Sequence, residues 1–258
     1  MAILNLTPDS FSDGGLYADL DSAVARAQAL IAEGADILDL GAESTRPGAE
    51  PVAEELELAR LLPVLEAVVP LGVPVSVDTY KPKVAGEALS RGARLINDVT
   101  GLRNPEMIAL LAEFNATAVI MHMPTTSPKD MQSHAKYRDV VSEVRDFLAL
   151  QAERALSAGV PGVILDPGIG FGKTHAHNLA LLKNLAQMVA LGHPVLVGAS
   201  RKKTIGELTG VNDPAERVAG SLAAHLFAVD QGATLIRVHD VRPHWQALRV
   251  WEALRWEK

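Results

Sequence analysis

The stretch VILDPGIGFGKTHAHNLALLKNLAQMVALG, residues 163–192, holds one complete unit of an α/β fold. Residues 163–165 are leucine or β-branched with no polar alternation, which is typical of a strand buried on both faces. A glycine-rich loop follows, and leucines then recur at helical spacing until Gly192, a residue type that commonly ends a helix. The stretch therefore predicts a strand, a loop and a helix in succession.

The same unit recurs along the whole chain. Eight stretches have the composition of buried strands: 2–7, 37–43, 73–79, 95–100, 117–122, 163–168, 195–200 and 235–240. Amphipathic, alanine-rich segments with helical spacing separate them, and a last one spans 242–256. This repetition predicts a single (β/α)₈ TIM barrel over residues 1–258, with its active site at the carboxyl ends of the strands. The alternative is an open doubly wound sheet, which eight similar units disfavour.

The loop of the opening stretch ends in Gly172-Lys173-Thr174, as a nucleotide-binding phosphate loop does. That loop needs a glycine five positions before its Gly-Lys pair, where this chain has Pro167, a residue without a backbone N–H to offer a phosphate. Asp166 also places a negative charge at the end of the strand. These two features exclude an ATP or GTP site.

Composition narrows the class of protein. The chain has 258 residues, is 48% hydrophobic and carries a formal net charge of −7, which indicates a globular protein and disfavours bulk nucleic-acid binding. It has no cysteine, so disulfides, thiolate nucleophiles and zinc–sulfur sites are excluded. No apolar run has the length of a membrane span and no signal peptide opens the chain, so we expect no membrane association and a cytoplasmic location.

Polar residues gather at the predicted carboxyl ends of the strands. In chain order these ends carry Asn5, 43–48, Asp78, 97–98, His122, Asp166, 200–203 and 237–240. Any one of them could simply cap a helix or satisfy a turn, Asp78 and Asp98 above all. Together they sort by charge: Asp78, Asn97 and Asp166 oppose Arg46, Lys202 and Arg237. The pattern predicts a pocket whose acidic half accepts a flat, donor-rich ring and whose basic half takes a phosphate or carboxylate.

Eight blocks of sequence at these strand ends resemble the dihydropteroate synthase family. They are ILNLTPDSFSDGG (3–15), GAESTRPGA (41–49), SVDTYKP (76–82), INDVTG (96–101), MHM (121–123), DPGIGFGK (166–173), SRK (200–202) and RVHDV (237–241). The resemblance implies a transferase of folate biosynthesis that joins 6-hydroxymethyl-7,8-dihydropterin diphosphate to p-aminobenzoate and releases diphosphate with Mg²⁺. It also implies a sulfonamide target and a homodimer.

The resemblance assigns a role to each motif. Asp78, Asn97, Asp166 and Lys202 would hold the pterin edge, and Arg237 would stack on the ring. Asn5 would hold Mg²⁺, with Asn5, Thr45, Arg46, Arg237 and His239 around the diphosphate. Phe11, Pro47, Phe171 and Lys203 would contact the aminobenzoate. Asp78, Arg46, Lys202 and Arg237 would carry catalysis, with Asp78 stabilising a pterin cation formed as diphosphate leaves. Loops 7–15 and 44–52 would close over the substrates.

The chain departs from the family pattern in places. Many relatives have a serine after the SRK block where this chain has Lys203, so backbone amides, Lys203 or Thr204 would take the aminobenzoate carboxylate. Relatives usually carry residues before the first strand, so we expect either a short member or a trimmed start. Lys173 receives no role, since it could equally be a solvated helix-start residue. His122, His134 and His225 are expected to be structural or surface residues.

Two other functions stay open at this level. A pterin-binding methyltransferase would share the barrel and the acidic residues, but the diphosphate motifs STRPG, SRK and RVH disfavour it. A non-catalytic paralog that only binds pterin would keep the same residues. For the homodimer, the apolar segment 245–256 offers a possible face, although its tryptophans would equally well pack on the barrel.

Overall fold

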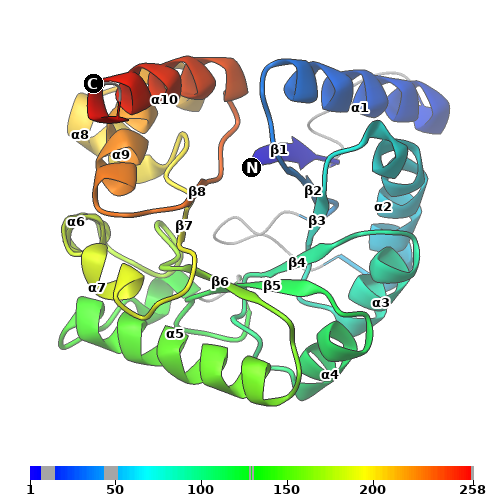
Figure 1. Ribbon diagram of the computed structural model, residues 1–258, viewed down its shortest axis with the longest axis horizontal. Coiled ribbons are helices and arrows are strands. Elements are labelled where there is room, and N and C mark those ends of the chain that lie inside the picture. Colours follow the sequence, from blue (N-terminus) through cyan, green and yellow to red (C-terminus); the bar gives the residue numbers. More distant parts are fainter. Residues whose placement is uncertain (7–14, 44–51, 128, 130, 257–258) are drawn as a thin grey trace.

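The computed structural model describes residues 1–6, 15–43, 52–127, 129 and 131–256, and its strands follow one another around a central axis with the helices outside them (Figure 1). The strands are β1 (Ala2–Asn5), β2 (Leu38–Gly41), β3 (Val75–Asp78), β4 (Leu95–Asp98), β5 (Thr117–Met121), β6 (Val163–Asp166), β7 (Leu196–Val197) and β8 (Leu235–Ile236). All the strand pairs are parallel, so the carboxyl ends of the strands lie on one side of the molecule.

The ring of strands closes at two narrow seams. Strands β1 to β6 form one sheet in chain order, and β7 pairs with β8. Single parallel bridges, Leu165 with Val195 and Ala2 with Val238, join these two sheets on both sides. An open doubly wound sheet would leave β1 and β8 far apart, whereas here they are neighbours. The predicted (β/α)₈ barrel is confirmed.

The helices form the outer layer of the barrel. They are α1 (Gly15–Ala32), α2 (Glu54–Val68), α3 (Pro82–Ser90), α4 (Pro105–Glu113), α5 (Val140–Ser157), α6 (His175–Lys183), α7 (Ala186–Val189), α8 (Lys203–Thr209), α9 (Val218–Asp230) and α10 (Val241–Trp256). Short 3₁₀ turns lie at Val69–Leu71, Met131–His134 and Pro214–Glu216. Among these described helices, none is both long and apolar enough to cross a bilayer.

The helix expected after β6 differs from the prediction. It is divided into α6 and α7 at Asn184, whose side-chain amide donates to the carbonyl of Ala180 at 2.9 Å. The backbone N–H of Asn184 donates to the same carbonyl at 3.1 Å, so both groups of Asn184 close the last turn of α6. A short polar side chain that bonds its own backbone competes with helical continuation, which the leucine spacing does not reveal.

An apolar plug fills one end of the barrel interior. It consists of Met1, Leu95, Val119, Ile164 and Leu196, with Ile37 and Leu235 packed against it. Successive side chains of a strand point to opposite faces, so residues two positions further along point inward as well. Asp39, Asn97, Asp166 and Arg237 each follow a plug residue by two positions. The alternation of the strands therefore directs these four polar side chains into the barrel, one layer nearer the carboxyl ends.

A buried pair of histidines ties two helices to the ends of β7 and β8. The backbone N–H of Ala199 donates to Nε2 of His225 at 3.0 Å, and Nδ1 of His225 lies 2.8 Å from Nε2 of His244. Nδ1 of His244 lies 2.6 Å from the carbonyl oxygen of Asp240. Because the two outer partners have fixed roles, both rings are neutral and carry their proton on Nδ1. The chain of bonds holds α9 and α10 against the two strand ends.

His225→Gln should make stability less sensitive to acid. Burial, assisted by His244, lowers the pKa of His225 to about 3 in the fold. Since this pKa is depressed, the contribution of His225 is complete above the unfolded pKa of about 6.5 and is lost as pH falls toward 3. Between pH 8 and pH 5, wild type should lose about 2 kcal/mol more of the free energy of unfolding than His225→Gln loses. Urea unfolding between pH 8 and 5 measures it, with His193→Gln as the matched control. Identical pH slopes in all three proteins would contradict this assignment.

Candidate functional site

Arg237 lies inside the barrel between two aspartates. Its Nε donates to Oδ2 of Asp39 at 2.6 Å, and its Nη2 donates to Oδ2 of Asp78 at 2.9 Å. The side chain of Asp39 is inaccessible to solvent, and Asp78 is also buried. Burial raises the pKa of Asp78 while Arg237 opposes that rise, and the two carboxylates in turn raise the pKa of Arg237 against its burial. The guanidinium thus joins β2, β3 and β8 across the interior.

Asn97 extends this cluster to β4. Its side-chain amide donates to Oδ2 of Asp39 at 3.3 Å, and the strand register sets it beside Asp78. Three buried acceptor atoms in the cluster have no hydrogen-bond partner among the described residues: Oδ1 of Asp39, Oδ1 of Asp78 and Oδ1 of Asn97. A buried polar atom without a partner is costly, so such a group indicates a missing donor. Three of them together fit a ligand with several N–H groups along one edge.

Asp166 belongs to the same end of the barrel. It is buried at the end of β6, where its Oδ1 accepts the backbone N–H of Gly168 at 2.7 Å. Burial raises the pKa of Asp166, and the positive charges of Lys202, Arg237 and Lys173 oppose the rise. This carboxyl group is a fourth acceptor of the cluster.

The glycine loop after Asp166 brings an aromatic ring to a cation. The ammonium of Lys202 lies 4.2 Å from the centre of the Phe171 ring, a cation–π distance. Gly170 has φ of +85°, and a Cβ built on it would lie 3.2 Å from Cδ of Lys202. A side chain at this position would be strained and would crowd the lysine. The glycine therefore lets Phe171 and Lys202 meet.

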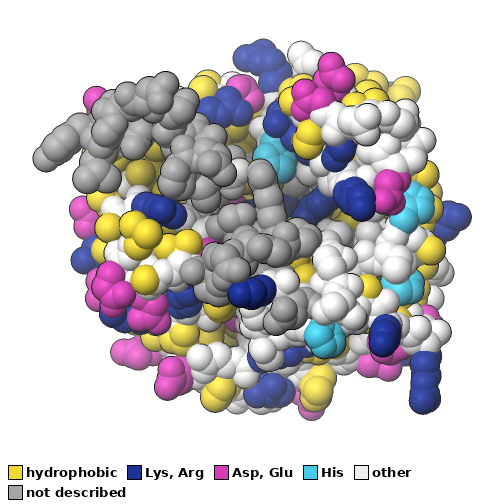
Figure 2. All heavy atoms as spheres, turned by 180° about the vertical axis from the view of Figure 1, so that it is seen from behind, with side chains coloured by type: hydrophobic (Ala, Val, Ile, Leu, Met, Phe, Trp, Pro, Cys, Tyr) yellow, Lys and Arg dark blue, Asp and Glu magenta, His cyan; other side chains and the backbone are white. Residues whose placement is uncertain are grey.

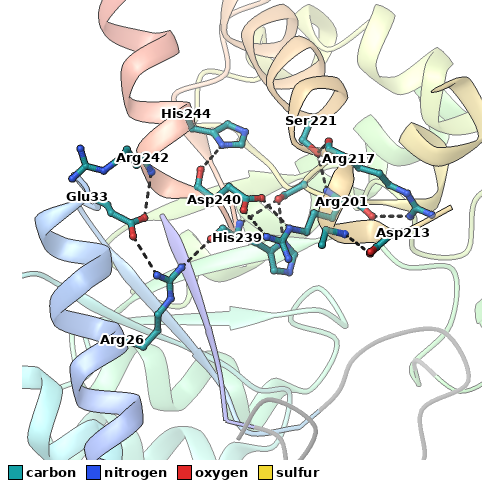
Figure 3. Close-up of polar contacts among 12 residues, drawn as sticks. Arg26, Glu33, Arg201, Asp213, Arg217, Ser221, His239, Asp240, Arg242 and His244 are labelled. Carbon is teal, nitrogen blue, oxygen red and sulfur yellow. Dashed lines mark hydrogen bonds and ion pairs between the residues drawn. The ribbon is translucent and has the colours of Figure 1, made fainter. Parts of the chain in front are cut away.

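Basic residues surround the ends of β7 and β8. Figure 3 shows Arg201 and Asp240 facing each other with His239 beside them, and Nε of Arg201 donates to Oδ2 of Asp240 at 2.9 Å. Oγ of Ser200 accepts the backbone N–H of His239 at 3.2 Å and lies 3.0 Å from its Nδ1. Where the hydroxyl donates its proton to Nδ1, the remaining proton of the neutral ring is on Nε2.

The pKa of His239 reflects the burial of its ring and the cations around it. Its pKa is lowered to about 3, first by burial and then by the cations Arg201, Arg237 and Lys202. A histidine held neutral by three cations marks a region of positive potential. An anion there would gain the charges of these cations and a hydrogen bond from Nε2.

Asn5 is the residue assigned to a metal. At the end of β1, its Oδ1 lies 3.9 Å from a Cβ built on Gly41, and Cβ of Asp78 lies 3.8 Å from the same point. The Asn5 amide therefore borders the acidic cluster. The described residues contain no group of three or more acidic, histidine or cysteine side chains arranged to hold a metal. One amide oxygen fits a Mg²⁺ ion that takes its remaining oxygens from a phosphorylated substrate and water.

The structure brings together Asn5, Asp78, Asn97, Asp166, Lys202, Arg237, Phe171 and His239, but not Lys203. The Lys203 side chain is 89% exposed and its ammonium lies 3.6 Å from Glu207, one turn along α8. It points to solvent because the first turn of α8 places it on the outer face of the helix. Phe11, Thr45, Arg46 and Pro47 lie outside the described residues.

Asp98 and Asp78 both lie at strand ends, but their carboxylates have different hydrogen-bond partners. Asp98 accepts the backbone N–H groups of Thr100 and Leu102 and the Thr100 hydroxyl, so it satisfies a turn. Among the described contacts Asp78 makes no such bond and instead pairs with Arg237. The interpretation as a helix cap is therefore wrong for both residues, since Asp98 satisfies a turn and Asn104 caps the following helix.

Sequence reasoning missed Asp39 and misjudged Lys173. Asp39 stands in the middle of the apolar stretch 37–41, and a charged residue in a doubly buried strand needs a buried partner. That signal was present. The solvated position considered for Lys173 is wrong, because Lys173 is only 5% exposed and its ammonium contacts His122 and the carbonyl of Phe171. The sequence contains no signal for this inward turn.

The base of the loop after β2 is held by a second ion cluster. The ammonium of Lys81 bonds Glu43, the carboxylate of Glu57 at 2.6 Å and the carbonyl of Val52 at 2.6 Å. Tyr80 donates to Glu43 at 3.0 Å. Glu43 and Val52 flank the segment 44–51, so this cluster fixes both points at which that segment joins the barrel.

On the face in Figure 2, the Lys and Arg side chains of the described residues are interspersed with Asp and Glu side chains and form no single block of charge. A nucleic-acid surface would instead show a contiguous basic patch. Inside the barrel, by contrast, charged side chains form a defined cluster, in which Arg237 is bonded to Asp39 and Asp78.

Comparisons with known proteins agree with this geometry. A family described as pterin binding enzyme matches residues 1–239. The dihydropteroate synthase of Neisseria meningitidis serogroup B is 49% identical over 98% of this chain and 92% of its own length. The Thermus thermophilus enzyme in complex with 4-aminobenzoate is 64% identical, with a TM-score of 0.91 over 98% of this chain and 93% of that one. The Thermus structure in complex with 6HMPPP is 62% identical, with a TM-score of 0.87 over the same shares.

Arg237→Met should destabilise the fold because it leaves Asp39 and Asp78 as unpaired buried carboxylates. Removing one partner of a buried ion pair costs about 3–5 kcal/mol of the free energy of unfolding. Adding Asp39→Asn should recover part of that loss, since one unpaired charge is then removed. Urea unfolding of both variants provides the measurement, and the exposed Arg242→Met should stay within about 1 kcal/mol of wild type. Equal stability of Arg237→Met and Arg242→Met would show that the buried pairs contribute nothing.

Proposed function

Because the chain belongs to the dihydropteroate synthase family, we propose that it condenses 6-hydroxymethyl-7,8-dihydropterin diphosphate with p-aminobenzoate in folate biosynthesis. The products are 7,8-dihydropteroate and diphosphate. The observation that carries this proposal is the group of unpartnered acceptors on Asp39, Asp78 and Asn97, which lies at the same end of the barrel as the cations of β7 and β8. One molecule with a donor-rich ring and a diphosphate would satisfy both.

The pterin ring would lie against the acidic cluster. Its amino group and ring N–H groups donate to Asp78, Asn97 and Asp166, while the ammonium of Lys202 donates to the ring carbonyl. Arg237 lies in the same layer and offers a planar guanidinium to the ring face. Its bonds to Asp39 and Asp78 hold that plane before substrate arrives, which is the preorganisation that a stacking contact needs.

The diphosphate would lie at the ends of β7 and β8. Nε2 of His239 donates to it, and Lys202 and Arg237 contribute positive charge. Thr45 and Arg46 are the proposed further contacts. Mg²⁺ held at Asn5 would neutralise charge on the departing diphosphate when bound. The C–O bond then breaks with its electron pair going to diphosphate, and the carboxylate of Asp78 stabilises the positive charge on the dihydropterin.

The aminobenzoate nitrogen completes the substitution. Its lone pair forms the new C–N bond, and the nitrogen then loses one proton to solvent. An arylamine is neutral at pH 7, so no strong base is needed. Phe171 is the described candidate for the aminobenzoate pocket, and the nearby Lys202 fixes its ring. Phe11 and Pro47 are the other proposed contacts. The exposed Lys203 would attract the carboxylate at long range.

A pterin-binding methyltransferase is the alternative enzyme. It would use the acidic cluster but has no need of a neutral histidine surrounded by Arg201, Arg237 and Lys202. That arrangement favours the synthase. The Thermus relative, solved with 6HMPPP and with 4-aminobenzoate, is further support.

A diphosphate-release assay tests the function. The protein should release diphosphate from the dihydropterin diphosphate only when p-aminobenzoate is present, and mass spectrometry should find 7,8-dihydropteroate in equal amount. Chelation of Mg²⁺ should lower turnover. Pterin binding without release would instead identify a non-catalytic paralog, and methyl transfer from methyltetrahydrofolate would favour the methyltransferase.

We also propose a homodimer formed through α9 and α10. Phe227, Val250 and Leu254 are exposed on these neighbouring helices, Leu254 to 84%. Trp245 on α10 is 48% exposed as well, although one edge of its indole packs against Gly34. Sedimentation equilibrium should give twice the chain mass, and Leu254→Glu should shift the distribution toward the monomer.

Asp166→Asn should weaken binding of the pterin substrate. The variant replaces an acceptor oxygen with an N–H₂ group that faces the donors of the ring, which should cost about 1–3 kcal/mol of binding free energy. Calorimetry of pterin diphosphate binding measures it, after thermal unfolding has confirmed the fold. Asp98→Asn is the matched control, because Asp98 is a buried strand-end carboxylate that only caps a turn. Equal affinities of the two variants would remove Asp166 from the site.

A further inference from the structure

Lys173 is a buried cation for which the proposed reaction has no use. Its ammonium lies 3.0 Å from Nδ1 of His122, 3.1 Å from the carbonyl oxygen of His122 and 3.0 Å from the carbonyl oxygen of Phe171. Three acceptors match the three protons of an ammonium group. Lysine is rarely buried without a partner, and here no carboxylate bonds it directly among the described contacts. Burying a charged ammonium costs free energy, and ionisable groups in such surroundings cluster at functional sites.

The contacts of Lys173 join two strand ends. His122 follows β5, and Phe171 belongs to the loop that follows β6. His122 is itself fixed, because its ring packs edge-on against Phe147 with centroids 5.0 Å apart. Burial, then the cations Lys173 and Arg103, lower the pKa of His122 to about 2, so the ring is a neutral acceptor. The hydrogen bonds of the ammonium therefore connect the rigid end of β5 to the glycine loop 167–172.

The glycine loop packs closely around the ammonium of Lys173. Gly168 has φ of +69°, and a Cβ built on it would lie 2.0 Å from the carbonyl oxygen of His122 and 3.2 Å from Nζ of Lys173. The same Gly168 donates its N–H to Asp166. One residue thus separates the ammonium from the carboxylate that is proposed to bind pterin. Further bonds hold the loop, from Gly170 N–H to Asn178 and from Tyr137 to the carbonyl of Gly172.

Charge links Lys173 to Asp166. Lys202, Arg237 and Lys173 are the cations that face this buried carboxyl group and keep its pKa from rising further. Lys202 and Arg237 would also contact the substrate, whereas Lys173 lies behind the loop. Burial lowers the pKa of Lys173 to about 7, with Asp166 opposing the fall and Lys202 adding to it. Its charge is thus present in acid and is lost as pH rises through about 7.

We propose that Lys173 is a positioning residue of the pterin pocket. Its ammonium fastens the loop 167–172 to the end of β5 and supplies part of the positive charge that keeps Asp166 ionised. The proposal rests on the proposed function in one respect, that Asp166 accepts hydrogen bonds from the pterin. Lys173 itself touches no substrate and acts through Asp166 and Phe171.

Steady-state kinetics of Lys173→Met test the proposal, with Lys183→Met on α6 as the matched control. In acid, below the pKa of Asp166, loss of the Lys173 charge should raise the KM for pterin diphosphate about tenfold for each unit by which the pKa of Asp166 rises. The acid limb of the pH profile of kcat/KM should therefore move to higher pH. The KM for p-aminobenzoate should change less. Lys183→Met, an exposed lysine of the next helix, should keep both the wild-type KM and the wild-type limb.

The possible outcomes separate this proposal from the proposed function. Absence of turnover in wild type and in Lys183→Met would count against the function itself. Normal turnover in those two, with an unmoved acid limb in a folded Lys173→Met, would overturn the role of Lys173 even if its melting temperature falls.

If Lys173→Met does not fold, Lys173→Arg and the wild type provide the test. Deprotonation leaves Lys173 two N–H groups for three acceptors and so loosens the loop, and the wild-type KM for pterin diphosphate should rise as pH increases through about 7. The arginine variant should lack that rise because it stays protonated. A wild-type profile that is flat across this range, or the same rise in both proteins, would overturn the proposal.

Discussion

The site depends on one buried ion cluster, Arg237 held between Asp39 and Asp78. In water such pairs contribute little, but inside the barrel a guanidinium without its carboxylates would be prohibitively costly. The bidentate geometry of arginine allows one residue to satisfy two strands at once. The cluster fixes the guanidinium plane and the spacing of β2, β3 and β8 together. Asn97 is placed relative to it through its bond to Asp39.

The apolar plug explains why this cluster can exist. Met1, Leu95 and Ile164 close the opposite end of the barrel, and the two-residue period of the strands then requires the next inward positions to face the open end. Polar residues placed there meet one another rather than water. The same barrel architecture therefore supplies both the hydrophobic core and a dry polar layer, in which hydrogen bonds to a ligand gain strength.

The sequence was sufficient for the barrel and for the strand-end residues that meet in the site, because strand periodicity and polar strand ends are local patterns. It also identified the basic region near His239. Three features escaped it. The partner of Asp39 and the contact of Lys173 with His122 lie far away in the chain, so no local pattern encodes them. The break at Asn184 depends on a contact only four residues back, which the leucine spacing conceals. Asp39 could have been found by asking what pairs with a charge inside an apolar strand.

Lys173 also explains why the glycine loop resembles a phosphate loop without being one. In a phosphate loop the backbone N–H groups and the lysine converge on the same anion. Here the N–H of Gly168 is taken by Asp166, and the lysine turns away from the pocket to carbonyl groups and a neutral histidine. The ammonium acts on the carboxylate from behind the backbone instead of on a phosphate in front of it. The same residue types, glycine and lysine at the end of a strand, thus support an anion of the protein rather than an anion of the ligand, and the difference follows from Pro167 and Asp166 at the start of the loop.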